Sequence, residues 1–425
     1  MKKLAFAIFC IIFAGSVNAQ NLIDIYKSGS VKLVPDSEYA QNNNWDKVFD
    51  TYYDTIYRKP MGNRKSLILL PDGSVVVNHA YKNYYTKFAP DGMFEKEFGI
   101  TNNNGERFKK TKQIAGIINE ETFFTGLDNL GNMICFDFNG DYVKTLKLDY
   151  MTKQMISLPN NKIAVVGWVI WSKKFRDFVA LVDYKTNDQN IIWEHFTDRL
   201  EPNEHKLFSY TYMFKERGGV AFTTMPYSKP TGLISRPKIA FVKNNFIIAN
   251  PTSGEISVYD LEGKLKSKHK IEWAKNYISV EEQKEIQEEA IKKYKSMKTF
   301  IGGSKIPPEE RKLAQETIIK QMEADLDKIS DPVPLPYFST MIKDSDDNLL
   351  FFEFPEEENA NKFNVWIYEN DGRFVCQSSF ICDEYKLEIN PSKMVFHNGY
   401  VYGLQLLKDS DSVPLRLVRF KLTSN

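Results

Sequence analysis

The chain has 425 residues, of which 42% are hydrophobic and 14% aromatic, and these fractions exclude a disordered chain. The formal net charge is +1, so no global charge imbalance points to nucleic acid or to a membrane surface. The aromatic residues are 22 Tyr, 30 Phe and 6 Trp, and this abundance of flat side chains favours β-strands.

The N-terminus has the features of a secretory signal peptide. Lys2 and Lys3 precede the apolar run 4–14, and small residues follow up to Ala19. The apolar run is too short to span a bilayer as a helix. We therefore expect cleavage after Ala19, a periplasmic or extracellular protein, and no transmembrane segment in the mature chain. Loss of the two lysines lowers the net charge from +1 to −1, and we expect no nucleic-acid partner.

A unit of four strands repeats along the chain. In its clearest copy, apolar strands are joined by two Pro-Asp-Gly turns, at 71–73 and 90–92. Asp bonds its own backbone in such turns and Gly accepts a positive φ. The strands of this copy are predicted at 67–70, 75–77, 85–88 and 93–98. Later copies begin near Ile114, Met155, Ile239, Met341 and Val395.

This repeat predicts an all-β chain folded as a β-propeller, with residues 20–425 forming one domain. The last copy ends after three strands, and residues 31–34 are expected to supply the fourth and close the ring. An extra hairpin, 210–214 with 220–225, has no recognisable second half. Complete units give six blades, whereas counting first turns gives seven, and both numbers stay open.

The unit resembles the NHL-type blade, most clearly at 247–251 and 256–263. The N-terminal half is similar to uncharacterised secreted six-bladed propellers of Bacteroides-like bacteria, through Pro35-Asp36, residues 45–49 and the Pro-Asp-Gly turns. The resemblance covers most of the mature chain and implies six blades. Its motifs are structural, so it implies a fold and leaves the activity open.

Residues 279–330 differ in composition and predict a helical hairpin inserted in the domain. Ser279 and Glu282 form a capping box, and Pro307-Pro308 opens a second helix. The hairpin is either a lid or partner-binding element, or a solvated hairpin packed on its parent blade, and its balanced charges favour the second. Docking to an envelope partner requires an exposed apolar stripe that includes Ile318, Met322 and Leu326.

The sequence contains none of the common catalytic motifs, and its five histidines lack ligand spacing. We therefore predict no cofactor and no metal site. Residues 344–348 resemble a calcium loop only briefly, because Leu349 and Pro355 occupy the positions of the required Gly and Glu. We interpret this segment as a hairpin turn. After signal removal three cysteines remain, and Cys376 and Cys382 either form a disulfide or stay free, as Cys135 does.

Basic residues precede the innermost strand of most units, and these positions meet at one tunnel mouth if all blades run the same way. The candidate ligand-binding residues are this basic set and the loop residues expected beside it: Lys65, Lys112, Lys153, Lys238, Lys393, His79, Trp168, Trp171, Tyr227 and Asn250. Such a mouth attracts an anionic ligand. The alternatives are that the cations only solvate loops and that the tryptophans pack between blades.

Two functions follow from these features. The favoured one is a secreted, non-enzymatic binding or scaffolding module for an extracellular glycan, a peptide or an envelope partner. The alternative is a propeller hydrolase or lyase acting on a carbohydrate or a lactone.

Overall fold

The structure is a computed structural model, and the chain forms two compact units. It describes residues 21–49, 53–54, 59–60, 65–79, 84–99, 105, 111–119, 121–127, 132–148, 150–169, 174–198, 206–214, 219–227, 236–296, 307–355, 361–410 and 413–424. Unit 1 comprises residues 1–128, 134–144 and 340–425, and unit 2 comprises 129–133 and 145–339. The expected signal peptide 1–19 lies outside the described residues. No helix in the described ranges has the length and apolar character needed to cross a bilayer.

The four-strand unit predicted at 67–98 is confirmed. Its antiparallel sheet contains β4 (Lys65–Leu69), β5 (Val75–His79), β6 (Tyr85–Phe88) and β7 (Phe94–Phe98), in that order. The next sheet contains β8 (Thr111–Ile117), β9 (Thr122–Leu127), β10 (Met133–Asp137) and β11 (Tyr142–Leu146). Each four-strand sheet therefore follows the chain order, as a series of antiparallel hairpins requires.

The turns explain why the hairpins form where the sequence predicts them. In the β6–β7 turn, Asp91 Oδ1 accepts the Met93 N–H at 3.0 Å, and Gly92 has φ +83°. A Cβ added to Gly92 would lie 2.7 Å from Ala40 Cβ, so Gly is also required for close packing. The equivalent Gly140 packs on Phe98 of the preceding sheet, where an added Cβ would lie 2.7 Å from the ring. The glycine of a turn therefore also allows close packing on the preceding sheet at Gly140 and on the N-terminal segment at Gly92.

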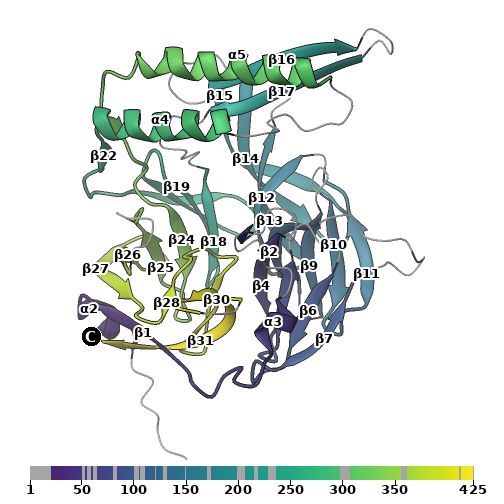
Figure 1. Cartoon of the computed structure of the whole chain (residues 1–425). Coiled ribbons are helices and arrows are strands. Elements are labelled where there is room, and N and C mark those ends of the chain that lie inside the picture. The colour runs from purple at the N-terminus through teal and green to yellow at the C-terminus, as the bar shows by residue number, and fades with distance from the viewer. Residues whose placement is uncertain are drawn as a thin grey trace, which may run out of the picture. The chain divides into compact units, whose positions relative to one another are not determined.

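The C-terminal strands of unit 1 and the N-terminal strand form one sheet. It contains β24 (Thr340–Lys343), β25 (Leu349–Phe352), β26 (Lys362–Tyr368), β27 (Phe374–Ile381), β28 (Tyr385–Lys386), β29 (Met394–His397), β30 (Tyr400–Leu407), β31 (Leu415–Ser424) and β1 (Val31–Pro35). The expected pairing of 31–34 is present, because β1 runs antiparallel to β31 from Val31 opposite Ser424 to Pro35 opposite Phe420 (Figure 1). A short parallel contact also joins β1 to β27.

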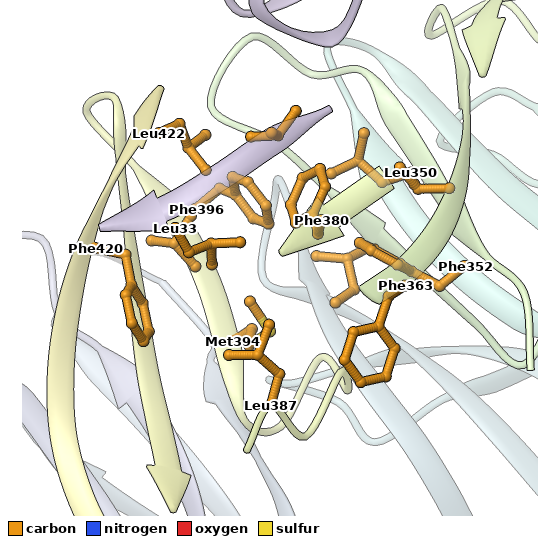
Figure 2. Close-up of a cluster of buried hydrophobic side chains, with 14 of the residues drawn as sticks. Leu33, Leu350, Phe352, Phe363, Phe380, Leu387, Met394, Phe396, Phe420 and Leu422 are labelled. Carbon is orange, nitrogen blue, oxygen red and sulfur yellow. The ribbon is translucent and has the colours of Figure 1, made fainter. Parts of the chain in front are cut away.

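A shared apolar core holds this sheet together (Figure 2). Leu33 on β1, Phe380 on β27 and Phe420 on β31 are buried in one cluster. Tyr26 joins it from α2 (Leu22–Lys27), and its ring stacks on Phe380 at 6.1 Å between centroids. The other N-terminal elements are α3 (Trp45–Val48), β2 (Tyr53–Asp54) and β3 (Lys59–Pro60). Residues more than 300 positions apart thus form one core, which ties both ends of the described chain together.

Unit 2 repeats the same strand pattern twice. One sheet contains β12 (Met151–Leu158), β13 (Lys162–Val169), β14 (Lys174–Asp183) and β15 (Gln189–Asp198), and the other contains β18 (Lys238–Val242), β19 (Asn245–Asn250), β20 (Glu255–Tyr259) and β21 (Leu265–Lys270). The extra hairpin is β16 (Lys206–Phe214) with β17 (Gly219–Tyr227), a two-stranded sheet with no third strand among the described residues. Among the described strands, the orphan hairpin of the sequence is therefore a two-stranded sheet of its own.

The insertion forms two helices, α4 (Val280–Ser296) and α5 (Pro308–Leu326), which lie side by side in Figure 1. Its base is the short pairing of β22 (Tyr277–Ile278) with β23 (Val333–Pro334). The capping box is confirmed, because Ser279 N–H donates to Glu282 Oε2 at 2.8 Å and Glu282 N–H donates to Ser279 Oγ at 3.1 Å.

The apolar stripe of α5 is used inside the protein. Ile318 is 0% exposed and Met322 is 2% exposed, whereas Leu326 is half-buried. Ile318 and Met322 pack in a cluster with Ile291 of α4. Gln287 also donates from its Nε2 to the Met322 carbonyl at 3.0 Å, which satisfies a buried amide between the helices. The exposed stripe that docking to an envelope partner would require is therefore not present at Ile318 and Met322, because these two residues form the contact between α4 and α5.

The three described cysteines are free thiols. Cys376 lies on β27 and Cys382 immediately follows it, six positions along an extended segment. Six residues of strand span about 20 Å, far beyond the reach of a disulfide. The Cys376–Cys382 disulfide is therefore excluded by the strand, and burial raises the pKa of both thiols.

Candidate functional site

The structure brings six of the ten candidate residues into two groups, one in each unit. In unit 2, Lys153 lies over the Trp168 ring, and Lys238 lies near Arg236, which also lies over that ring; in unit 1, Lys65 lies across the strand pair from His79 and accepts a hydrogen bond from Lys393. The backbone of Lys112 lies on β8 and that of Tyr227 on β17, but their side chains and all of Trp171 lie outside the described residues. Because each group belongs to its own unit, a single basic ring made of both remains a prediction.

A β-bulge sets the position of Lys153. The register of β12 against β13 shifts between Thr152 and Gln154, which leaves Lys153 as the extra residue opposite the end of β13. A bulge re-aims the side chain of the extra residue. Trp168 lies at this end of β13, opposite Met151 on one side and Asp177 of β14 on the other. The bulge therefore places a lysine beside a tryptophan at the sheet end.

Two cations lie over the Trp168 indole. Lys153 Nζ is 4.9 Å from the ring centroid and Arg236 Cζ is 4.6 Å from it. Both distances are within the range of cation–π attraction, which is strongest for tryptophan. Arg236 Nε also contacts Asp177 Oδ1 at 3.1 Å, in a pair whose side chains are 16% and 15% exposed. The indole and one carboxylate thus hold the two cations in place.

Lys238 adds a third positive charge to this group. Burial, and then the charge of Arg236, lower the pKa of Lys238. Its strand is fixed by Gln154, whose Nε2 donates to the Ile239 carbonyl at 3.0 Å and whose Oε1 accepts the Ile239 N–H at 3.2 Å. These bonds connect β12 to β18 and hold the start of β18 close to the bulge.

We call Lys153, Trp168, Asp177, Arg236 and Lys238 the Trp168 cluster. It contains three cationic residues and one carboxylate. The Trp168 Nε1–H is buried and has no hydrogen-bond acceptor among the described residues. A buried donor without an acceptor costs about 1–3 kcal/mol. The cluster therefore combines three cationic residues with a buried indole N–H that has no described acceptor, and both suit an anionic acceptor.

The second group lies at the start of β4 in unit 1. Lys65 pairs with His79 across β4 and β5, and the two side chains are 4% and 1% exposed. His79 Nε2 is 2.8 Å from Thr86 Oγ1, and Lys65 Nζ is 5.7 Å from the centre of the Phe49 ring. These residues are packed inside the unit and are not solvated loop cations.

Lys393 completes this group, which we call the Lys393 cluster: Lys65, His79, Glu388 and Lys393. Lys393 is 2% exposed, and its Nζ donates to the Lys65 carbonyl. Burial lowers the pKa of Lys393 to about 7, while the Glu388 carboxylate acts in the opposite direction and the Lys65 charge adds to the lowering. Lys393 is thus an amine whose protonation changes near neutral pH.

Asn250 has a local structural role. Its Oδ1 accepts the Thr252 N–H at 2.9 Å and the Ser253 N–H at 3.3 Å, so it caps the β19–β20 turn.

The interpretation of 344–348 as a turn is confirmed, because Asp344 Oδ1 accepts the N–H groups of Asp346 and Asn348. Among the described residues no group of three or more His, Cys, Asp or Glu side chains could hold a metal ion.

Sequence reasoning missed Asp177, and it placed Gln154 and Arg236 before innermost strands without selecting them as ligand-binding residues. Asp177 is identified only by the β13–β14 register, which places it opposite Trp168. Gln154 and Arg236 act across two sheets, and their partners lie more than 50 positions away. The sequence carries no signal for such contacts between sheets.

Comparison with known proteins found no matching family model and no matching curated protein. Similar solved structures include a Bacteroides fragilis protein whose name describes it as exported, with 10% identity, a TM-score of 0.46, and coverage of 95% of this chain and 97% of that one. A DUF4221 family member from Bacteroides vulgatus has 11% identity and a TM-score of 0.43, with 94% and 100% covered. Virginiamycin B lyase from Staphylococcus aureus has 11% identity and a TM-score of 0.37, with 85% and 96% covered. Likeness at this level carries no argument for function.

Proposed function

We propose that the protein is an exported, six-bladed β-propeller that binds an anionic ligand through the Trp168 cluster. The blade number is supported by the strand pairing of the described residues: four separate four-stranded sheets, and two further sets of four strands, β24–β27 and β29–β31 with β1, within the nine-stranded sheet. The hairpin β16–β17 stands outside this series. Export rests on residues 1–19, which have the pattern of a signal peptide.

The observation that carries the binding function is the pair of cations held over Trp168. Because both lie over the indole, the ring orients charged groups and does not serve as a bare stacking platform for a sugar. Asp177 forms an ion pair with Arg236, one of the three cationic residues of the cluster. A carboxylate or phosphate group beside the cluster would accept charge-assisted hydrogen bonds from its cations. No observation in the described residues favours the hydrolase or lyase alternative.

Isothermal titration calorimetry of the mature protein with D-galacturonate and with inorganic phosphate tests this proposal, with D-galactose as the neutral ligand. We expect at least one of the two anions to bind and galactose not to bind. The Lys153→Gln variant should weaken binding about tenfold, since a hydrogen bond to a charged group contributes about 1.5–3 kcal/mol.

The matched control is Lys185→Gln, an exposed lysine in the β14–β15 turn of the same sheet. Its loss changes the net charge equally, so it should leave binding unchanged. If neither anion binds, or if both variants weaken binding to the same degree, the proposed function is refuted.

A further inference from the structure

The edge strand β21 carries a row of lysines that the Trp168 cluster does not use. Lys266, Lys268 and Lys270 lie on β21 and Lys264 immediately precedes it, and all four are exposed. β21 is the last strand of its sheet and pairs only with β20 among the described strands. The register of β20 against β21 shifts at Lys266, which is the extra residue of a β-bulge, so the four lysines do not alternate as in a regular strand. All four are nevertheless exposed within seven residues of one edge, so their positive charges lie along a short stretch of that edge.

Protection of the sheet edge does not account for four lysines. Edge strands often carry lysine to prevent pairing with another chain. The last strands of the other three separate four-stranded sheets are different: β7 mixes Glu95, Lys96 and Glu97, β11 has Lys144 alone, and β15 carries Glu194 and Asp198. Among the last strands of these four described sheets, β21 is the one whose charged residues are lysines with no acidic residue and more than one cation, although all four strands lie at the same edge of their sheets.

The protein neutralises little of this charge. Lys268 Nζ contacts Glu255 Oε1 at 2.9 Å, in an exposed pair that contributes little to stability. Lys266 Nζ donates to the neutral amide of Asn245, at 3.0 Å from Oδ1. Among the described residues, Glu255 is the one carboxylate in a salt bridge with this row. The row therefore presents a net positive surface to solvent.

We propose that β21 is a docking surface for a linear acidic polysaccharide. An extended row of separate charges matches a chain that carries one carboxylate after another, and many weak contacts add up along such a chain. Lysine supplies flexible point charges that follow a polymer without a fixed geometry, unlike the planar fork of arginine. The choice of a polysaccharide over a nucleic acid rests on the proposed export. The surface shares no residue with the Trp168 cluster, so either proposal can fail without the other.

The test is affinity electrophoresis of the mature protein in gels containing polygalacturonate, at low and high salt. We expect retardation that salt abolishes. Replacing Lys264, Lys266, Lys268 and Lys270 together with Gln should weaken binding about tenfold or more, since each exposed ion pair contributes little but the four add up along the polymer. Replacing the same four with Arg should retain binding, because the charge is kept.

The matched control replaces four exposed lysines of the helical hairpin, Lys284, Lys292, Lys293 and Lys320, with Gln. It removes the same net charge from a surface rich in acidic residues, and it should bind as the wild type does. The proposal is overturned if the wild type is not retarded, or if both Gln variants lose binding equally. Equal retardation by single-stranded DNA would overturn the assignment to a polysaccharide. Binding of galacturonate monomer should be unchanged in the β21 variant, which separates this surface from the Trp168 cluster.

Discussion

Replacement of Lys393 by Met should make the protein less sensitive to pH. The Lys393 amine is buried, and burial lowers its pKa from 10.5 to about 7. The unfolded chain therefore holds this proton more tightly than the folded chain does. The protonated amine destabilises the folded state fully below pH 7, and this penalty disappears as the pH rises from 7 to 10.5. Met has a similar length and no charge, so the variant lacks the penalty at every pH.

The size of the effect follows from the two pKa values. Each pH unit between them changes the free energy of unfolding by up to about 1.4 kcal/mol. Between pH 7 and pH 9 the free energy of unfolding of the wild type should rise by roughly 2 kcal/mol because of Lys393. The rise is less than two full pH units would give, because Lys393 in the folded protein is still partly protonated just above pH 7. The variant loses the bond from Nζ to the Lys65 carbonyl, a cost of about 1 kcal/mol that does not depend strongly on pH.

Urea unfolding at pH 7 and pH 9 measures this difference. The advantage of Lys393→Met over the wild type should be larger at pH 7 by roughly 2 kcal/mol. Lys47→Met, at an exposed lysine of the same unit, is the control and should show no such change. If the stability curves of the wild type and Lys393→Met stay parallel from pH 7 to pH 9, Lys393 does not have the buried, lowered pKa on which the reasoning depends.

Two further substitutions test the packing. Arg419→Gln should lower the free energy of unfolding in urea by about 1–3 kcal/mol. The reason is that Arg419 contacts Asp36 Oδ2 at 2.6 Å and lies over two tyrosine rings at 4.7 Å. A decrease below about 0.5 kcal/mol would contradict this. Ile318→Ala should cost about 2–5 kcal/mol as a cavity in the α4–α5 contact, whereas Leu313→Ala on the exposed side of α5 should stay within about 0.5 kcal/mol. Equal costs at the two positions would mean that Ile318 is not a packing residue.

The sequence predicted the hairpins well because their determinants are local. An Asp that bonds the backbone two residues on, followed by a Gly with positive φ, specifies a turn wherever it occurs, as at Asp91 and Gly92. The helical hairpin was equally predictable, because Ser279 and Glu282 fix its start. The pairing of 31–34 with the last strand followed from counting strands. In each case the information lies within one segment or one repeat.

The candidate sites were less predictable because they depend on contacts between segments far apart in the chain. Lys65 and Lys393 were expected at a solvated mouth, yet both are buried, and their contact joins positions 328 apart. The bulge at Lys153 is a matter of register, which the hydrophobic pattern of β12 does not show. Sequence patterns thus located the residues at the ends of strands, while only the packing shows which of them meet.

Measurement of the six tryptophan indole N–H signals by nitrogen-15 NMR, during titration with D-galacturonate and with phosphate, tests the central claim most directly. Trp168→Phe identifies the Trp168 signal, and Trp366, whose N–H donates to Glu353 in unit 1, is the internal reference. The account predicts that the Trp168 signal moves with an anion and not with galactose, that the Trp366 signal stays in place, and that Lys153→Gln reduces the change. A Trp168 signal that does not respond to either anion, at concentrations that saturate binding in calorimetry, would contradict the claim that this cluster binds the ligand.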